Sequence, residues 1–376
     1  MPSLLSLPLM PRILLGLSQE VFRTLAASWG EPAYRGSQLY HALYAERRFD
    51  LASLSNLPKQ LRARLAEEAS VGLPGIEHCY LATDGTIRYV LRLTDGQRIE
   101  TVFMPDGDLP EERLPGDPRG RQTLCLSTQA GCAVNCHFCA TAQLGLLRNL
   151  TAGEIVGQLL LALEENRPRL RPQTNVVLMG QGEPLLNYEN VVRAVHLMAD
   201  PNGMNLSLRH ITLSTSGIVP GIRRLAGEPV RPRLAVSLNA SSNEQRTQIM
   251  PINKKYPLEE LLAACRDYPL RPGERLTFEY VLLGGFNDTP EDARRLVRLL
   301  SGLRAKVNLI AWNPVPELPY RAPRPDDVSE FQKVLTTNDL NAFLRRPRGQ
   351  DVFAACGQLA LLAVNTASKT SASLSV

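Results

Sequence analysis

The chain has 376 residues, of which 44% are hydrophobic and 21% charged, enough for one large or two moderate globular domains with a buried core. Its formal net charge of +5 permits an anionic partner without requiring one. The apolar opening, residues 1–17, is broken by prolines and by Arg12, so it is neither a signal peptide nor a membrane span. We expect a disordered or loosely packed extension there.

Residues 18–72 show apolar residues at helical spacing. Ser18 stands where a helix N-cap is expected, and the run from Gly36 to Tyr44 repeats apolar residues at helical intervals. Prolines and an aspartate divide the segment into three or four short helices. The sequence predicts a small accessory helical domain whose arginines fit a nucleic-acid module or a solvated charged face equally well.

Residues 73–121 change to strand-like patterns. β-rich runs between residues 79 and 104 are separated by Asp84-Gly85 and Asp95-Gly96, dipeptides typical of tight hairpin turns. We therefore expect a short antiparallel β extension. A linker rich in proline, glycine and charge follows over residues 106–121.

Residues 122–361 alternate between strand and helix patterns. The expected strands cover residues 123–127, 175–179, 210–214, 234–238, 276–283 and 306–312, with a last short strand near 342–345. Repeated βα units predict an α/β fold with a parallel sheet, closed or nearly closed as a partial (β/α)6 barrel. Such barrels carry their chemistry at the carboxyl ends of the strands. Residues 362–376 form a Ser/Thr-rich tail.

Several expected strands end in small or polar residues. These ends supply Gly182, Glu183, Ser214, Ser237, Leu238, Asn239 and Asn313. Glycine lets backbone approach a ligand closely, a carboxylate accepts from an ammonium group, and serine and asparagine suit hydroxyls and base edges. Singly each is more often a turn residue, but together they favour a ligand site.

The most informative stretch is Cys132-Ala-Val-Asn-Cys136-His-Phe-Cys139. Three thiolates in eight residues can hold one inorganic centre, and no fourth cysteine follows at a comparable spacing. This open three-cysteine pattern resembles the radical S-adenosylmethionine (SAM) enzymes, which implies a [4Fe-4S] cluster with one free iron that binds SAM. The alternative is a structural zinc site in an RNA-binding module. Seven cysteines without regular pairing indicate a reducing cytoplasm.

The remaining four cysteines differ in their surroundings. We expect Cys79 and Cys265 to be buried as small apolar residues. Cys125 lies just before the three-cysteine loop. Cys356 follows the basic segment 345–348 and precedes a glycine, which makes a reactive thiolate plausible there.

Residues 123–150 and five further motifs together resemble the RlmN-type adenine-C2 RNA methyltransferases. These motifs are Met179-Gly-Gln-Gly-Glu-Pro-Leu-Leu-Asn, Leu213-Ser-Thr-Ser-Gly, Pro251-Ile-Asn-Lys-Lys-Tyr, Trp312-Asn-Pro and Ala355-Cys-Gly-Gln-Leu. The resemblance runs from about residue 18 to 361. It implies methylation of C2 of one adenosine in 23S ribosomal RNA (rRNA) and of an anticodon-adjacent adenosine in tRNA. A related alternative is methylation of adenine C8.

The resemblance also implies residue roles. Cys132, Cys136 and Cys139 would hold the cluster, and Cys356 would carry the methyl group as S-methylcysteine. Glu100 would accept a proton from the base, and Cys125 would release the product through a transient disulfide with Cys356. The strand-end residues from Gly182 to Asn313 would bind SAM. Many relatives have methionine at Gln181 and histidine at Asn239, so these two positions depart from the pattern.

The implied partners are 23S rRNA, tRNA and an electron donor such as flavodoxin or ferredoxin, with no membrane and a monomeric chain. Adenosines in loops can be splayed into a pocket and read on their edges. Aromatic residues make up only 6% of the chain, so we do not expect a stacking platform. Candidates for RNA phosphate contacts are Arg209, His210, Lys254, Lys255, Arg345, Arg346 and Arg348.

Overall fold

The computed structural model describes residues 11–105, 120–315 and 317–361, so residues 1–10 of the expected extension, the whole of the expected tail and most of the linker lie outside it. The helices are α1 Gln19–Ser28, α2 Ala33–Tyr44, α3 Lys59–Glu68, α4 Ala140–Gln143, α5 Ala152–Glu165, α6 Tyr188–Ala199, α7 Val219–Ala226, α8 Asn243–Ile249, α9 Leu258–Arg266, α10 Pro290–Leu300 and α11 Pro325–Thr337. The strands are β1 Arg12–Ile13, β2 Ala69–Ser70, β3 Gly75–Leu81, β4 Ile87–Arg92, β5 Arg98–Pro105, β6 Arg121–Cys125, β7 Gln129–Gly131, β8 Leu146–Asn149, β9 Gln173–Leu178, β10 Ile211–Thr215, β11 Arg233–Ser237, β12 Leu276–Leu282, β13 Ala305–Ala311 and β14 Ala342–Leu344.

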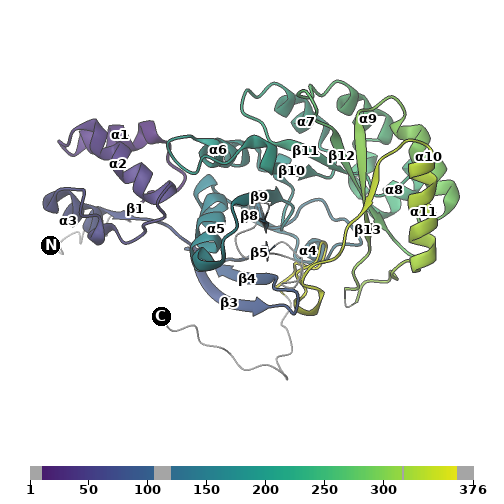
Figure 1. The fold of residues 1–376 in the computed structure, drawn as a ribbon, viewed down its shortest axis with the longest axis horizontal. Coiled ribbons are helices and arrows are strands. Elements are labelled where there is room, and N and C mark those ends of the chain that lie inside the picture. The colour runs from purple at the N-terminus through teal and green to yellow at the C-terminus, as the bar shows by residue number, and fades with distance from the viewer. Residues whose placement is uncertain (1–10, 106–119, 316, 362–376) are drawn as a thin grey trace, which may run out of the picture.

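One ten-stranded sheet organises the molecule, in the order β14-β13-β12-β11-β10-β9-β6-β5-β4-β3. Strands β6 and β9 to β14 are parallel, which confirms the predicted α/β architecture. Helices α7, α9, α10 and α11 lie along the outer face of the parallel part (Figure 1). Alternation explains why: β13 buries Ala305, Val307 and Leu309 on one face while Lys306 and Asn308 lie on the other.

The sequence suggested a separate small antiparallel sheet, but strands β3 to β5 belong to the main sheet. β5 pairs with β6, so that Val102 lies opposite Cys125, and the antiparallel strands extend the barrel sheet. Hairpin signals specify neighbouring strands but not which further strand they join. This pairing brings β5, which carries Glu100, next to the strand that carries Cys125.

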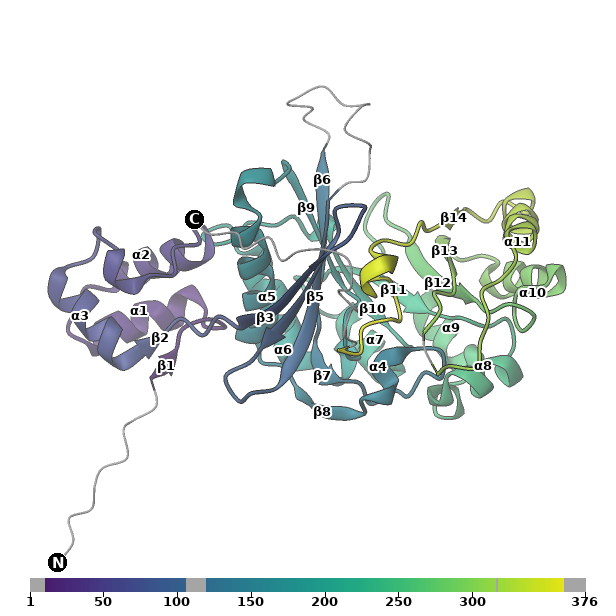
Figure 2. The same ribbon diagram turned by 90° about the horizontal axis from the view of Figure 1, so that it is seen from below.

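The N-terminal helices pack as a compact unit beside the sheet (Figure 2). Phe22 makes edge contacts with Tyr40 and Tyr44 between α1 and α2. The expected loose extension is wrong for its inner part, because Leu14 and Leu15 are buried and β1 pairs with β2. The sequence obscured this because a two-residue strand has no periodic signal.

No helix within the described ranges has the length and apolar character needed to cross a membrane.

Residues 14–16 cross α5 at a point where only glycine fits. A Cβ on Gly153 would lie 2.3 Å from the carbonyl oxygen of Leu15. Gly157, one turn later, would place its Cβ 3.1 Å from a side-chain carbon of Pro74. At 3.1 Å the neighbour must shift by only a few tenths of an ångström, whereas at 2.3 Å the backbone itself must move.

We predict that Gly153→Ala lowers the free energy of unfolding by about 1–3 kcal/mol through overpacking. A glycine-to-alanine change inside a helix otherwise stabilises by about 1 kcal/mol, so the expected sign is opposite to that of helix propensity. Urea denaturation of the two variants measures this difference, with Gly157→Ala as the matched control. Equal stability of the two variants would contradict a backbone clash at residue 153.

Candidate active site

The three-cysteine loop connects β7 to α4. The Cys132 N–H donates to the Gly145 carbonyl at 2.8 Å, and the Cys139 N–H donates to the Cys136 carbonyl at 3.1 Å. Asn135 lies in the left-handed region, with φ of 56°, and turns the chain between the first two cysteines. The loop therefore has a defined backbone that holds three half-buried thiols.

The chemistry of these thiols fits an iron–sulfur cluster. Burial raises the pKa of all three, that of Cys132 to about 12, and the neighbouring Cys139 and Cys132 raise the pKa of Cys136 further. Three thiolates this close therefore need a cationic centre. Among the described residues, no group of three His, Cys, Asp or Glu is arranged to hold a single metal ion.

The strand ends beside the loop carry the predicted ligand residues. Glu183 is buried, and its two carboxylate oxygens accept from the N–H groups of Leu185 at 3.0 Å and Ser216 at 2.7 Å. Gly182 adopts φ of +104°, and a Cβ there would meet Gln129 at 2.6 Å. Ser214 and Ser237, on adjacent strands, place their hydroxyl oxygens 3.4 Å apart. The structure thus brings these predicted residues to one edge of the sheet.

Leu238 and Asn239 have most of their polar groups engaged within the protein. The Leu238 N–H donates to the Glu279 carbonyl, and the Leu238 carbonyl accepts from Arg246. The Asn239 side chain accepts from the Val281 N–H at 2.9 Å and donates to the Met250 sulfur. In this structure both residues therefore shape the strand ends.

Arg246 is a buried residue of the site that sequence reasoning missed. Its guanidinium donates to the carbonyls of Ser216 at 2.5 Å and Leu238 at 3.1 Å and to the Asn253 side chain at 3.1 Å. Burial lowers its pKa to about 10, which leaves it charged at neutral pH. Its charge also lowers the pKa of Cys136. The only hint in the sequence was that this arginine lies five residues before Pro251, the start of one of the family motifs.

The C-terminal loop that carries Cys356 is attached to the start of α4, directly after the three-cysteine loop. The Ala140 N–H donates to the Gly357 carbonyl at 2.8 Å, and the Thr141 hydroxyl donates to the Leu359 carbonyl at 2.6 Å. Asn313 donates to the Cys356 carbonyl at 3.3 Å. A residue predicted as a ligand thus also holds the loop of Cys356.

Cys125 and Cys356 are brought together, although 231 positions separate them in the sequence. Cys125 is buried among Val102, Val352 and Leu359, and electrostatic repulsion from Cys356 adds to burial in raising the pKa of Cys125. Both cysteines carry free thiols. The structure therefore places an unbonded thiol pair beside the cluster loop.

The structure does not support the expected reactive thiolate at Cys356 in this state of the protein. Although the residue is exposed, protein atoms packed around its sulfur and then Glu279 raise the pKa of Cys356 to about 11, and Arg345 offsets only part of this. Arg348 does not stabilise a Cys356 thiolate, because its guanidinium forms an ion pair with Asp84 at 2.9 Å. Of the two cysteines expected to be buried, Cys265 is buried and Cys79 is exposed on β3.

Glu100 lies fully buried on β5, at the centre of a polar network. It accepts from the Arg88 guanidinium at 2.7 Å, the Gln181 amide at 3.2 Å and the Leu361 N–H at 3.0 Å. Burial raises the pKa of Glu100 despite these donors, which suits a proton acceptor. Arg88 was not predicted from the sequence.

The three-cysteine loop at the carboxyl edge of a parallel sheet defines this protein as a radical SAM enzyme. The radical SAM superfamily model matches residues 126–300, and the model described as "Ribosomal RNA large subunit methyltransferase N-terminal domain" matches residues 13–71. The chain belongs to the RlmN family, and as a radical SAM enzyme it uses a [4Fe-4S] cluster and SAM.

Individual relatives match over most of their length. The chain is 51% identical to a probable dual-specificity RNA methyltransferase RlmN of Koribacter versatilis, over 88% of this chain and 96% of that protein. It is 47% identical to the RlmN protein of Anaeromyxobacter dehalogenans, over 92% and 90%. The crystal structure of a radical SAM methyltransferase from Sphaerobacter thermophilus superposes with a TM-score of 0.86 at 43% identity, over 93% and 99%.

Alkylation tests the protonation of Cys356. In metal-free protein, we predict that the iodoacetamide reaction of the Cys356 peptide speeds up about tenfold per pH unit from pH 7 to 10, because only the thiolate reacts and the pKa is about 11. Mass spectrometry of the peptide follows the label, with glutathione as the ordinary thiol and Cys356→Ser as the blank. A rate that levels off near pH 9 would contradict the raised pKa.

Proposed function

We propose that this radical SAM RNA methyltransferase transfers a methyl group to C2 of an adenosine in 23S rRNA and of an anticodon-adjacent adenosine in tRNA. The observation that carries this proposal is the placement of two free thiols, Cys125 and Cys356, beside the three-cysteine loop and near Glu100. C2 of adenine is an electron-poor carbon, so direct transfer of a methyl cation to it is unavailable. A carrier thiol and a radical route together meet that requirement.

When bound, the cluster and SAM supply the electron and the adenosyl radical that make a C–H bond reactive. Cys132, Cys136 and Cys139 would hold the cluster, and Gly182, Glu183, Ser214, Ser237, Leu238, Asn239 and Asn313 would form the SAM site. In the proposed roles, Cys356 carries the methyl group on its sulfur. Because that thiol holds its proton in this structure, its methylation requires loss of the proton.

Glu100 and Cys125 would complete the transfer. Once the carbon on the Cys356 sulfur has lost a hydrogen atom and bonded to C2, the adduct must give up one electron, which the oxidised cluster would accept. Glu100 takes the C2 proton of the base, a role that its raised pKa suits. Cys125 then attacks the Cys356 sulfur, so that a disulfide forms and the carbon–sulfur bond to the product breaks. The electron pair goes to the product carbon, which takes a proton. An external thiol then reduces the disulfide and returns both cysteines to the state seen here.

Two alternative functions can be distinguished from C2 methylation, one by the methylated nucleoside that is formed and the other by the metal that the protein contains. Methylation of C8 would give a different nucleoside, which mass spectrometry of digested RNA identifies by comparison with standards. A zinc-bearing RNA-binding module would contain zinc and no iron. Membership in the RlmN family favours C2 over both.

We further infer a reduced flavodoxin or ferredoxin as the electron donor, a monomeric chain and a cytoplasmic location. A reducing compartment is favoured by free thiols whose role requires them to be re-reduced.

The Cys125→Ala variant tests the two-thiol arrangement. Because no thiol remains to release the product, we predict covalently attached RNA on Cys356, and nuclease digestion leaves one adenosine on that peptide. Cys265→Ala, which removes a buried cysteine outside the site, serves as the control and accumulates no adduct. If Cys125→Ala retains its cluster and SAM cleavage yet forms no adduct, Cys125 is not the releasing thiol.

A second prediction concerns Gln181, which donates to Glu100. In Gln181→Met the carboxylate loses one hydrogen-bond donor, so the pKa of Glu100 rises further and the base form is lost at a higher pH. The acidic limb of the pH–rate profile for methyladenosine formation should move to higher pH. Gln60→Met, on the exposed face of α3, is the control. Superimposable profiles would show that Gln181 does not set the basicity of Glu100.

A further inference from the structure

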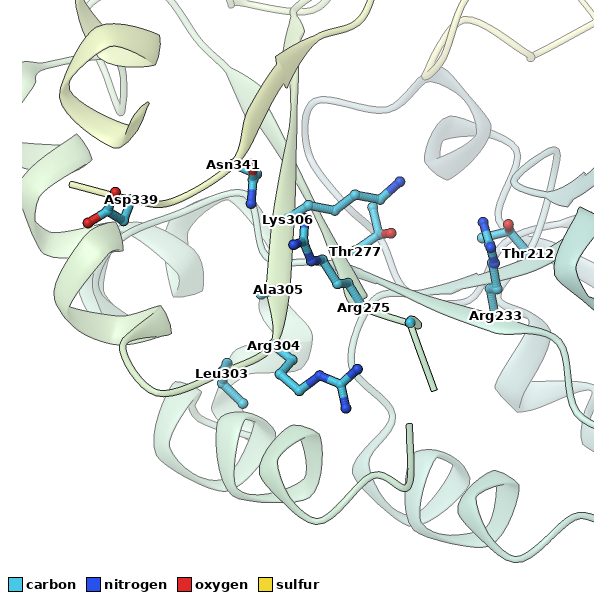
Figure 3. Close-up of a pocket in the computed structure, with 11 residues that line it drawn as sticks. Thr212, Arg233, Arg275, Thr277, Leu303, Arg304, Ala305, Lys306, Asp339 and Asn341 are labelled. Atoms are coloured by element: carbon cyan, nitrogen blue, oxygen red, sulfur yellow. The ribbon is translucent and has the colours of Figure 1, made fainter. Parts of the chain in front are cut away.

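A second site lies at the end of the barrel away from the cysteines. A cavity of about 530 Å³ opens at the amino ends of β10 to β13. In Figure 3, Thr212 and Arg233 line one side, Asp339 and Asn341 the other, and Arg275, Arg304 and Lys306 lie between them. None of these residues belongs to the site described above.

The charge of this cavity is unbalanced. Arg233, Arg275, Arg304 and Lys306 line it together with one carboxylate, Asp339. None of the four cations forms an ion pair with a residue in the described ranges. Burial and then Arg233 lower the pKa of Lys306, and the buried Glu279 carboxylate on the same face offsets this only in part, so a repulsion remains that a bound anion would relieve.

Strand register connects the cavity to the catalytic edge. Thr277 pairs with Lys306 in one row across the sheet. Two residues further along the same strands, Glu279 pairs with Asn308, and this second row begins at Ser237. Side chains two residues apart lie on the same face, so one inner face carries both rows. From Arg233 to Ser237 the distance along the strand is only about 13 Å at ~3.3 Å per residue.

The second row ends in an exposed aromatic residue. Phe343 on the edge strand β14 pairs with Asn308, and 51% of Phe343 is exposed. Its neighbour Ala342 is buried on the opposite face, against the layer that contains α11. Phe343 is therefore an aromatic side chain at the open edge of the same inner face, at the level of Ser237. The low aromatic content had led us to expect no stacking platform, so the sequence did not point to Phe343.

We propose that this face is an RNA subsite, in which Arg233, Arg275 and Lys306 bind backbone phosphates next to the target nucleotide and a flanking base stacks on Phe343. The proposal rests on the proposed function of the catalytic edge. Phosphates provide the missing negative charge, and an aromatic platform beside a cationic groove is the usual pattern for single-stranded RNA. A concave cavity accommodates a phosphate better than the flat face of an acidic protein.

Charge removal tests the phosphate contacts. We measure the affinity of a fluorescein-labelled RNA hairpin with an adenosine in its loop, over a range of salt concentrations, for Arg233→Gln, Arg275→Gln and the double variant. Each change should weaken binding several-fold and reduce the slope of log Kd against log salt by about 0.7–1. Arg298→Gln on the outer face of α10, where Arg298 pairs with Glu291, is the matched control and should change neither quantity.

Aromatic removal tests the stack. Phe343→Ala should weaken binding about tenfold and leave the salt slope unchanged, because stacking is not a charge interaction. Leu344→Ala is the matched control, since Leu344 is 46% exposed on the next residue of the same strand. Unchanged thermal unfolding midpoints establish that each variant is folded.

The outcomes separate this proposal from the function on which it rests. Methylation is assayed with dithionite as reductant, so docking of a donor protein plays no part. If the wild type makes no methyladenosine, the proposed function fails whatever the variants do. If the wild type methylates RNA and the variants match it in affinity and salt slope, the subsite is wrong. The subsite is also wrong if the variants bind inorganic pyrophosphate more weakly than the wild type but bind RNA equally well. It is wrong as well if the variants lose activity only when reduced flavodoxin replaces dithionite as the electron donor.

Discussion

The catalytic edge depends on the burial of ionisable groups that lack matching opposite charges. Glu183 is stabilised by two backbone N–H groups and forms no ion pair with any cation of the described ranges. Arg246 is stabilised chiefly by backbone carbonyls, and no described carboxylate pairs with it. Buried ions solvated by backbone dipoles keep their positions only while the backbone keeps its shape. The strand-end loops and these two side chains therefore fix one another.

Hydrogen bonds to buried groups also explain why the C-terminal loop can be irregular and still hold Cys356 in place. It contains four residues with positive φ, Gly349, Phe353, Gly357 and Leu361, and its regular structure amounts to one short helical turn. Its position comes from donors at the start of α4 and from Glu100, which accepts from the Leu361 N–H. Glu100 is thus a candidate proton acceptor and also an anchor for the loop. The chemistry of Cys356 is coupled to the order of that loop.

Features that repeat along the chain could be predicted from the sequence. Alternating strand and helix patterns placed the parallel strands within one or two residues, and cysteine spacing singled out the three-cysteine loop as the candidate cluster site. Features set by contacts between distant segments could not. The pairing of β5 with β6, the packing of Leu14 and the burial of Arg246 each depend on a partner far away in the sequence. The protonation state of Cys356 was not predicted for the same reason, because desolvation of the sulfur and the distant Glu279 outweigh the nearby Arg345.

Because the strands are parallel, one substrate could contact both ends of the same strands, with its phosphates at the amino ends and its reacting base at the carboxyl ends. The amino ends of β11 to β13 carry cations, and the same strands carry hydroxyl, carboxylate and amide groups towards their carboxyl ends. Strands are stiff over such short lengths, so the spacing between a phosphate contact and a reacting base would be set by residue count. Helices on the outer face bury the alternate side chains and leave this inner face free for binding. A sheet open at β14 then admits a nucleotide that is still attached to its RNA chain, which a closed barrel would exclude.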